Sequence, residues 1–369
     1  MSTIGILTMS RAYNHGALLQ AYALKTTLKR LGGEAKIVNY APPYQMDKYR
    51  GVFDHEKSIR AVARNMMKSI HYPSLKKGAD LYQRFIDEEL NGKDKILCSR
   101  EDMEQAAEEY DAIIVGSDQM WNMRLPDVTD TYFLDFTFRG KRMTYAVSMG
   151  DQVPFSRANE EHYLDLIGRF DKITVREGIG EQYLRSHGIS STVAPDPSIL
   201  LSMEEWNEFA REETHLPAGG YVFYYSVKTS EHVYQMAKEI GKQLKLPVIT
   251  CILALKTEIH TDFIRCFDIG PRGFVDCIRN ASFVCTDSYH GTLFSILFEK
   301  PFFSAFENEA SYVSSARRAE LLAILQLKDR MAAPSTKIDP HQDIDYSESK
   351  HCLYEMKNNA LHMLQSVMI

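Results

Sequence analysis

The stretch that decides the fold reads Phe283-Val-Cys-Thr-Asp-Ser-Tyr-His-Gly-Thr-Leu-Phe-Ser-Ile-Leu-Phe298. The apolar run from Phe283 to Cys285 predicts a buried strand, and the apolar residues between Leu293 and Leu297 recur at helical spacing. Asp287 or Ser288 is a natural N-cap for the helix that follows the strand. A strand that leads directly into a helix is typical of α/β folds with parallel sheets.

The same stretch contains a histidine at a position where open α/β sheets bind ligands. We expect His290 and Gly291 to lie in the first turn of the helix, at the carboxyl end of the strand. A helix start favours anionic groups, and an imidazole there can transfer protons to an anionic ligand. The alternative is a capped helix whose histidine only packs against its neighbours.

Strand and helix patterns alternate along most of the chain. Ile4 to Met9 predicts a strand, Ala17 to Leu31 predicts a helix with one apolar face, and Lys36 to Tyr40 predicts a second strand. A similar alternation resumes after Tyr221. Because 369 residues suffice for two cores, we expect an α/β protein with two doubly wound, Rossmann-like domains that face a cleft.

The pattern also suggests where the domains end. We place an N-terminal domain at residues 1–197, with a helical insertion at about residues 41–91, and a C-terminal domain at residues 198–345. Residues 346–369 predict a closing helix that packs back on the N-terminal domain. The insertion contains amphipathic helices rich in Lys and Arg, which form a lid, an acceptor-facing surface or a solvated hairpin.

Composition excludes several classes of protein. The chain has 43 basic and 49 acidic residues, a formal charge of −6, which argues against a nucleic-acid partner. The six cysteines form no C-x-x-C pair, and H-E-x-x-H is absent, so we expect no metal site. Because the sequence shows neither a signal peptide nor an apolar run of membrane-spanning length, a cytoplasmic location is the expectation.

Two loops that follow predicted strands carry polar side chains. Asn14-His-Gly16 resembles a turn that cradles phosphate, or is a plain strand-to-helix turn. In Val115-Gly-Ser-Asp-Gln-Met-Trp-Asn122, Asp118 could orient or deprotonate a sugar hydroxyl, and Trp121 could stack on a pyranose ring. Their alternative roles are a helix cap and a core side chain.

Arginines at two further positions suit the binding of an anion. Arg176 and Glu177 end another predicted strand, where Arg176 could hold a carboxylate or phosphate, or form a surface pair with Glu177. Arg317 and Arg318 lie at the start of a predicted helix from Ser314 to Leu325, and one of them could reach the site.

Together these motifs resemble the polysaccharide pyruvyl transferase family. They keep the family's order and extend from residue 4 to about residue 330. The matching pieces are Asn14-x-Gly16-Ala17-x-Leu19-Gln20-Ala21-Tyr22-Ala23-Leu24, Gly116-Ser117-Asp118-Gln119-x-Trp121-Asn122, Thr174-Val-Arg176-Glu177, Asp196-Pro197-Ser198 and Asp287-Ser-x-His290-Gly291.

The resemblance implies a GT-B-like transferase of polysaccharide or exopolysaccharide biosynthesis. Such proteins transfer a pyruvyl group from phosphoenolpyruvate to two hydroxyls of a sugar and form a cyclic ketal. It implies an N-terminal domain on the acceptor side, a C-terminal domain that contributes to the donor site, and no cofactor besides the donor substrate. The partners would be the donor and a sugar or lipid-linked glycan, which leaves room for peripheral association with a membrane.

The resemblance also implies roles for individual residues. His290 would be the general acid beside the donor, and Asp118 would be the base toward the acceptor. The expected donor-binding residues are Asn14, Gly16, Arg176, Ser288, Gly291 and Arg318. The expected acceptor-binding residues are Gln119, Trp121 and Asn122.

One position departs from the family pattern. Many members carry an arginine two residues before the histidine, where this chain has Ser288, so another cation must compensate. Arg11, Arg317 and Arg318 are the candidates. Two other functions stay open: a GT-B glycosyltransferase that uses a nucleotide-sugar, and a non-enzymatic module that binds carbohydrate or docks a partner.

Overall fold

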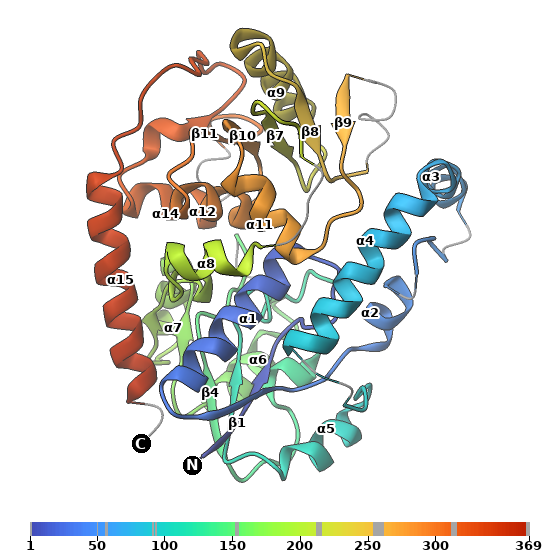
Figure 1. Cartoon of the computed structure of the whole chain (residues 1–369). Helices are drawn as coiled ribbons and strands as arrows, with labels where there is room; N and C mark the ends of the chain where they lie inside the picture. The colour runs from blue at the N-terminus through green and yellow to red at the C-terminus, as the bar shows by residue number, and fades with distance from the viewer. Residues whose placement is uncertain are drawn as a thin grey trace. The chain divides into compact units, whose positions relative to one another are not determined.

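The computed structural model describes residues 2–49, 51–55, 58–90, 92, 94–151, 155–211, 216–253, 262–310 and 316–366 (Figure 1). The chain divides into two compact units. The first unit comprises Met1–Arg50, Arg84–Leu201 and Tyr354–Ile369, and the second comprises Gly51–Gln83 and Ser202–Leu353. Each unit contains its own parallel sheet.

The first unit is built on a four-stranded parallel sheet in the order β2-β1-β3-β4. Parallel bridges join Met143 to Lys172 and Val147 to Val175, and so connect this sheet to the β5–β6 pair. Its strands are β1 (Thr3–Leu7), β2 (Glu34–Ile37), β3 (Ala112–Val115), β4 (Lys141–Thr144), β5 (Thr174–Val175) and β6 (Thr192–Val193). Its helices are α1 (His15–Arg30), α2 (Pro43–Lys48), α5 (Arg100–Ala107), α6 (Glu160–Gly168) and α7 (Gly178–Ser186), with short turns η1 (Ile86–Leu90), η2 (Asp130–Phe133) and η3 (Pro197–Ile199).

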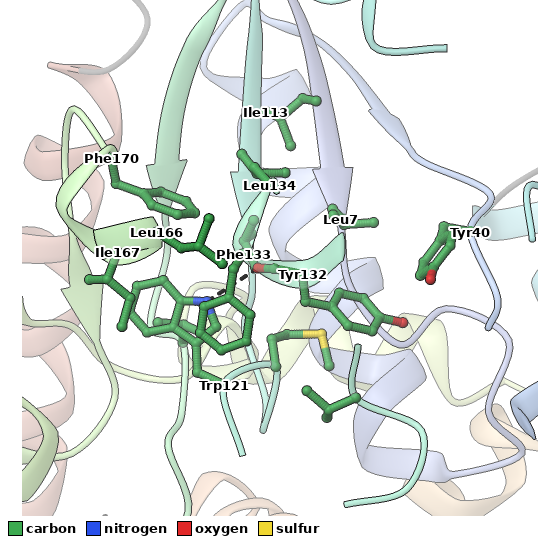
Figure 2. Close-up of a cluster of buried hydrophobic side chains, with 14 of the residues drawn as sticks. Leu7, Tyr40, Ile113, Trp121, Tyr132, Phe133, Leu134, Leu166, Ile167 and Phe170 are labelled. Carbon is green, nitrogen blue, oxygen red and sulfur yellow. Dashed lines mark hydrogen bonds between the residues drawn. The ribbon is translucent and has the colours of Figure 1, made fainter. Parts of the chain in front are cut away.

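The core of the first unit lies against one face of this sheet (Figure 2). Leu7 and Ile113 point to this face and are fully buried. They pack with side chains of α6, including Leu166 and Ile167, around the ring of Trp121. Burial of this kind stabilises the unit by about 25 cal/mol for each Å² of apolar surface removed from water.

The second unit is built on a six-stranded sheet in the order β12-β11-β10-β7-β8-β9, and all its strands are parallel. Its strands are β7 (Val222–Tyr225), β8 (Val248–Thr250), β9 (Phe263–Arg265), β10 (Phe283–Thr286), β11 (Phe302–Ala305) and β12 (Met331–Ala332). Its helices are α3 (Ile59–Ile70), α8 (Met203–Phe209), α9 (Glu231–Leu244), α11 (Pro271–Arg279), α12 (Tyr289–Leu297) and α14 (Ala316–Ile324), with the short turn η4 (Lys328–Arg330). The start expected for the last of these helices, at Ser314, lies outside the described residues.

Helices cover both faces of the second sheet. Tyr224 of β7 belongs to a buried cluster with Tyr234 and Ile240 of α9. Phe223, the preceding residue, points to the opposite face and contacts Phe274 of α11, with ring centroids 6.1 Å apart. Successive side chains of a strand alternate between faces, so this sheet is doubly wound. The expected class, two doubly wound α/β domains, is confirmed.

The placement expected for the insertion is wrong in one respect. Residues 51–83 belong to the second unit and not to the N-terminal one. The helix α4 (Tyr72–Phe85) packs closely on the loop after β9, where a side chain at Gly78 would collide with the carbonyl oxygen of Phe267. Lys77 also forms an ion pair with Asp268 over 3.0 Å.

The last helix, α15 (Ser347–Gln365), passes from the second unit into the first. Lys172 Nζ donates a hydrogen bond to Ser366 Oγ over 2.7 Å, which ties the end of this segment to the first unit. Residues 367–369, where the expected helix was to end, lie outside the described residues. Among the helices described, none is both long enough and apolar enough to cross a membrane.

Candidate active site

Polar side chains of the first unit gather where its parallel strands end. Asp118 follows β3, Arg176 follows β5 and Asp196 follows β6. Parallel strands bring their carboxyl ends to one edge of the sheet, which is where open α/β sheets bind ligands. Three loops that are far apart in the sequence therefore meet at this edge.

Arg176 is the centre of this group. Its Nη1 donates to Asp196 Oδ2 over 2.9 Å, and its Nε donates to Glu177 Oε1 over 2.9 Å. Its Nη2 lies 3.5 Å from Asp118 Oδ1. The side chains of Arg176, Glu177 and Asp196 are at most 3% exposed, so the Arg176–Glu177 pair is buried and not a surface pair.

This setting changes the role expected for Arg176. One guanidinium faces three carboxylates, and the group carries a formal charge of −2 when all of them are ionised. A buried charge is tolerated when it is paired and hydrogen-bonded, and Arg176 meets that condition through protein carboxylates. Among these contacts the carboxylates outnumber the guanidinium, which disfavours the binding of a further phosphate or carboxylate at Arg176. Arg176 therefore fits the positioning of Asp118 better than the binding of an anionic donor.

Asp118 is the most exposed carboxylate of the group, with 14% of its side chain accessible. Its backbone has φ of 65°, in the left-handed region that asparagine and aspartate tolerate better than most residues. Its carbonyl oxygen accepts hydrogen bonds from the amides of Met120 and Ser148, each over 2.8 Å. A strained residue held by its neighbours is typical of functional sites.

Gln20 is a site-forming residue that the sequence reasoning missed. From the buried face of α1, its Nε2 donates to Thr8 Oγ1 over 2.9 Å. Its Oε1 accepts from the amide of Ser117 over 3.0 Å. Through these hydrogen bonds the Gln20 side chain connects the loop after β1 to the loop before Asp118. The signal was a glutamine among the apolar positions of a predicted helix, since a buried amide needs partners.

Asn14 and Gly16, expected to bind the donor, lie at the start of α1. Asn14 Oδ1 accepts from the amide of Ala17 over 3.2 Å, so this side chain caps the helix. Gly16 is buried within the first turn. Burial lowers the pKa of His15, between them, to about 3, so its imidazole is neutral near pH 7.

The expected stacking of Trp121 on a sugar is wrong. Its side chain has no exposed surface and lies stacked on Phe133, with ring centroids 5.5 Å apart (Figure 2). Its Nε1 donates to the carbonyl oxygen of Tyr132 over 3.2 Å. A large aromatic side chain in a tightly packed core removes much apolar surface from water. Trp121 has this structural role and is not accessible to a ligand.

The other two expected acceptor residues lie beside Asp118. Asn122 Nδ2 donates to Gln119 Oε1 over 2.8 Å. Gln119 is partly exposed, whereas Asn122 is 9% exposed. A side chain at Gly150 would crowd the Asn122 amide, and φ of 88° at Gly150 also favours glycine there. Gln119 is thus the more accessible of the two amides.

In the second unit, His290 lies at the start of a helix, as the sequence predicted. Ser288 caps α12, and its Oγ accepts from the amide of Gly291 over 3.3 Å. His290 lies in the first turn of that helix, directly after β10, and only 7% of it is exposed. The positive end of a helix dipole lies at this turn, which favours an anionic ligand.

Two neighbours fix the backbone that carries His290. Asp287 accepts hydrogen bonds from Ser226 Oγ and from the amide of Val227, each over 2.7 Å, which joins the ends of β10 and β7. A side chain at Gly291 would collide with Thr286 Oγ1. Gly291 is therefore required by close packing, a reason independent of its expected contact with the donor.

Arg318 lies at the carboxyl end of the neighbouring strand, β11. Its Nη1 donates to Ser304 Oγ over 3.0 Å and to the carbonyl oxygen of Ala305 over 2.6 Å. Ser304 Oγ lies 2.9 Å from Thr292 Oγ1, which donates to the carbonyl oxygen of Ser288 over 2.9 Å. Arg318 is 7% exposed. A short chain of hydrogen bonds thus connects this guanidinium to the start of α12.

The other candidate cation with described contacts, Arg11, belongs to the first unit. Its Nε donates to Asn39 Oδ1 over 2.8 Å. Burial lowers its pKa from the ordinary arginine value. Within the described ranges, no group of three or more His, Cys, Asp and Glu side chains is placed to hold a metal ion.

Comparison with known proteins places this geometry in context. The family model described as polysaccharide pyruvyl transferase matches residues 14–309. The UDP-GlcNAc 2-epimerase of Methanocaldococcus jannaschii is 11% identical with a TM-score of 0.53, and the match covers 97% of this chain and 93% of that chain. A proposed UDP-N-acetylglucosamine 2-epimerase of Listeria monocytogenes is 12% identical with a TM-score of 0.51, and the match covers 98% and 97%. No curated protein matches the chain. At these identities the likeness shows the fold, which is the two-domain GT-B fold.

Proposed function

Because this chain belongs to the polysaccharide pyruvyl transferase family and is therefore a transferase, we propose that its donor is phosphoenolpyruvate and its product a cyclic ketal. The acceptor would be a sugar with two suitably placed hydroxyls, in a cell-surface glycan or its precursor. The observation that carries the proposal is the buried His290 at the start of α12, close to the carboxyl end of β10.

The reaction needs a general acid beside the donor. His290 would give a proton to the methylene carbon, which leaves an oxocarbenium-like centre at the carbon that bears the phosphate. The first sugar hydroxyl would attack that carbon, and the bond to the phosphate oxygen would then break. The second hydroxyl would close the ring. Of the two protons released, one replaces the proton of His290 and the other leaves with phosphate.

Arg318 is the cation that we assign to the donor in place of the arginine missing at Ser288. Both residues belong to the second unit, and Ser304 and Thr292 connect them through hydrogen bonds. A guanidinium and a helix start together would stabilise the charge that grows on the departing phosphate. Arg318 lies over the ring of Phe306 at 4.2 Å, a contact that holds its plane in place.

Asp118 would act as the base toward the acceptor hydroxyl, with Arg176 as the residue that positions it. The 3.5 Å separation of Arg176 Nη2 and Asp118 Oδ1 supports that division of roles. Gln119, partly exposed beside Asp118, would contact the sugar. A carboxylate held by a buried guanidinium keeps its orientation while it accepts a proton.

Thermal stabilisation separates the donor assignment from its main competitor. A ligand that binds only the folded protein at a concentration of about one hundred times its Kd adds about 2.7 kcal/mol of stability. We expect phosphoenolpyruvate to raise the melting temperature, and nucleotide-sugars to leave it unchanged. The reverse result would instead favour a glycosyltransferase.

Turnover tests the role of His290 directly. His290→Gln should abolish ketal formation and leave the melting temperature within the range of the wild type. His351→Gln, on an exposed position of α15, is the matched control and should keep full activity. Ketal formation at the wild-type rate by the His290 variant would remove this residue from the mechanism.

A further inference from the structure

The helix α3 exposes its apolar side chains to solvent. Ile59, Val62, Met66 and Ile70 recur at steps of three and four and so share one face, which we call the apolar stripe. Their exposed fractions are 91%, 53%, 67% and 74%. In a globular protein the apolar face of a surface helix normally points to the core.

The opposite face of α3 makes polar contacts with the loop that precedes the helix. Ala61 on that face is fully buried. Arg64 and Lys68 each form an ion pair with Asp54 over 2.7 Å. Asn65 Oδ1 accepts from the amide of Asp54 over 2.8 Å, and Asn65 Nδ2 donates to its carbonyl oxygen over 2.9 Å. These contacts fix the helix with its apolar stripe outward.

The next helix, α4, helps to hold α3 in this orientation. The ring of Phe53 stacks on that of Tyr72, with centroids 5.5 Å apart. His71 packs on the ring of Phe267 at 5.2 Å. Since α4 is in turn packed on the loop after β9, α3 leads into a helix that is itself held to the second unit (Figure 1). The exposure of the apolar stripe is thus a property of the fold of this unit.

The charge of this segment is opposite to that of the rest of the chain. Residues 51–83 contain six basic and three acidic residues, a formal charge of +3. The other residues contain 37 basic and 46 acidic residues, a formal charge of −9. A basic segment in an acidic chain, with an outward apolar face, is typical of a helix that lies on an anionic membrane surface.

We propose that α3 docks this protein on the surface of an anionic lipid bilayer, with the apolar stripe inserted among the lipid chains near the headgroups. At about 1.5 Å per residue, its 12 residues span about 18 Å, too short to cross a bilayer but suited to lie in its plane. The net positive charge of the segment as a whole attracts the anionic headgroups, while Arg64 and Lys68 on the opposite face stay paired with Asp54. This inference does not depend on the proposed function, because binding can be measured without turnover.

Flotation of the full-length protein with lipid vesicles tests the proposal. We expect binding to vesicles of phosphatidylcholine mixed with phosphatidylglycerol, and much weaker binding to phosphatidylcholine alone. Met66→Glu should weaken binding to the mixed vesicles roughly tenfold or more, since it removes an inserted apolar side chain and adds a negative charge. Met66→Leu should bind as the wild type does.

The matched control is Tyr354→Glu on α15, because Tyr354 is 63% exposed and the change in charge is the same. This variant should bind as the wild type does, and all variants should keep the wild-type circular dichroism spectrum. Equal binding to both kinds of vesicle, or full binding by Met66→Glu, would overturn the proposal. So would a dimer in sedimentation velocity that Met66→Glu dissociates, since the apolar stripe would then be an interface between two copies.

Discussion

Arg176 Nη1 and Asp196 Oδ2 form a hydrogen-bonded ion pair over 2.9 Å, in which neither side chain is more than 2% exposed. The pair joins the end of β5 to the segment after β6. Asp196 Oδ1 also accepts from the amide of Ser198 over 3.0 Å. One carboxylate thus binds a buried guanidinium and caps a turn, and so connects two segments of the first unit.

Removal of this carboxylate should destabilise the protein. We expect Asp196→Ala to cost about 1–3 kcal/mol, because Arg176 Nη1 and the amide of Ser198 lose a buried acceptor, although Glu177 still pairs with Arg176. Urea unfolding followed by fluorescence measures the change. The control is Asp165→Ala, which breaks an exposed pair with Arg169 and should cost less than about 1 kcal/mol. Equal effects of the two changes would contradict the buried role.

Arg176 should affect the acceptor step more than donor binding. Arg176→Met removes the contact that orients Asp118, so we expect kcat to fall about tenfold or more with little change in the KM for phosphoenolpyruvate. Steady-state kinetics at varied donor concentration separate the two parameters. A large rise in the donor KM with unchanged kcat would restore the donor role expected from the sequence.

Arg318 should show the opposite pattern. Loss of a hydrogen bond to a charged group costs about 1.5–3 kcal/mol, so Arg318→Met should raise the KM for phosphoenolpyruvate about tenfold to a hundredfold. The neighbouring Arg317, half-buried on the same helix, supplies the matched control Arg317→Met. If that control alone lost donor affinity, Arg317 would be the compensating cation instead.

His15 should make stability depend on pH. Its pKa is lowered to about 3 in the folded protein by burial, whereas an unfolded histidine titrates near 6.5. The unfolded chain therefore takes up a proton first, and stability falls as pH drops below about 6.5 until it levels near pH 3. At pH 5 the loss is about 2 kcal/mol. In melting curves, His15→Gln should flatten this dependence, and the exposed His351→Gln should not.

Gly291 should tolerate no side chain. Gly291→Ala places a methyl group against Thr286 Oγ1, which itself donates to the carbonyl oxygen of Tyr225 over 2.7 Å. We expect a loss of about 1–3 kcal/mol from overpacking. Combination with Thr286→Ala should recover part of it, so the two changes should not be additive. Gly168→Ala, with open space at the end of α6, is the control and should be close to neutral.

Local patterns in the sequence were enough to predict the α/β class and the helix that carries His290. The apolar run of β10, the N-cap at Ser288 and the helical spacing after it are all encoded within sixteen residues. Such signals are local, because a strand that ends in a cap and a helix needs only its own residues to be specified. The family motifs also predicted which strands end in polar side chains, and in which order along the chain.

Contacts between segments that are far apart in the sequence decided the features of the site that local patterns do not predict. The sequence does not show that Arg176 meets Asp196, twenty residues later, or that Trp121 lies inside a cluster of aromatic rings. Nor does it show that Gly78 lets α4 join the second unit. Burial and charge neutralisation depend on which surfaces meet after the chain has folded. The sequence therefore determined which residue types were available for chemistry. Only the tertiary structure decided which of these residues are buried and stabilise the fold instead.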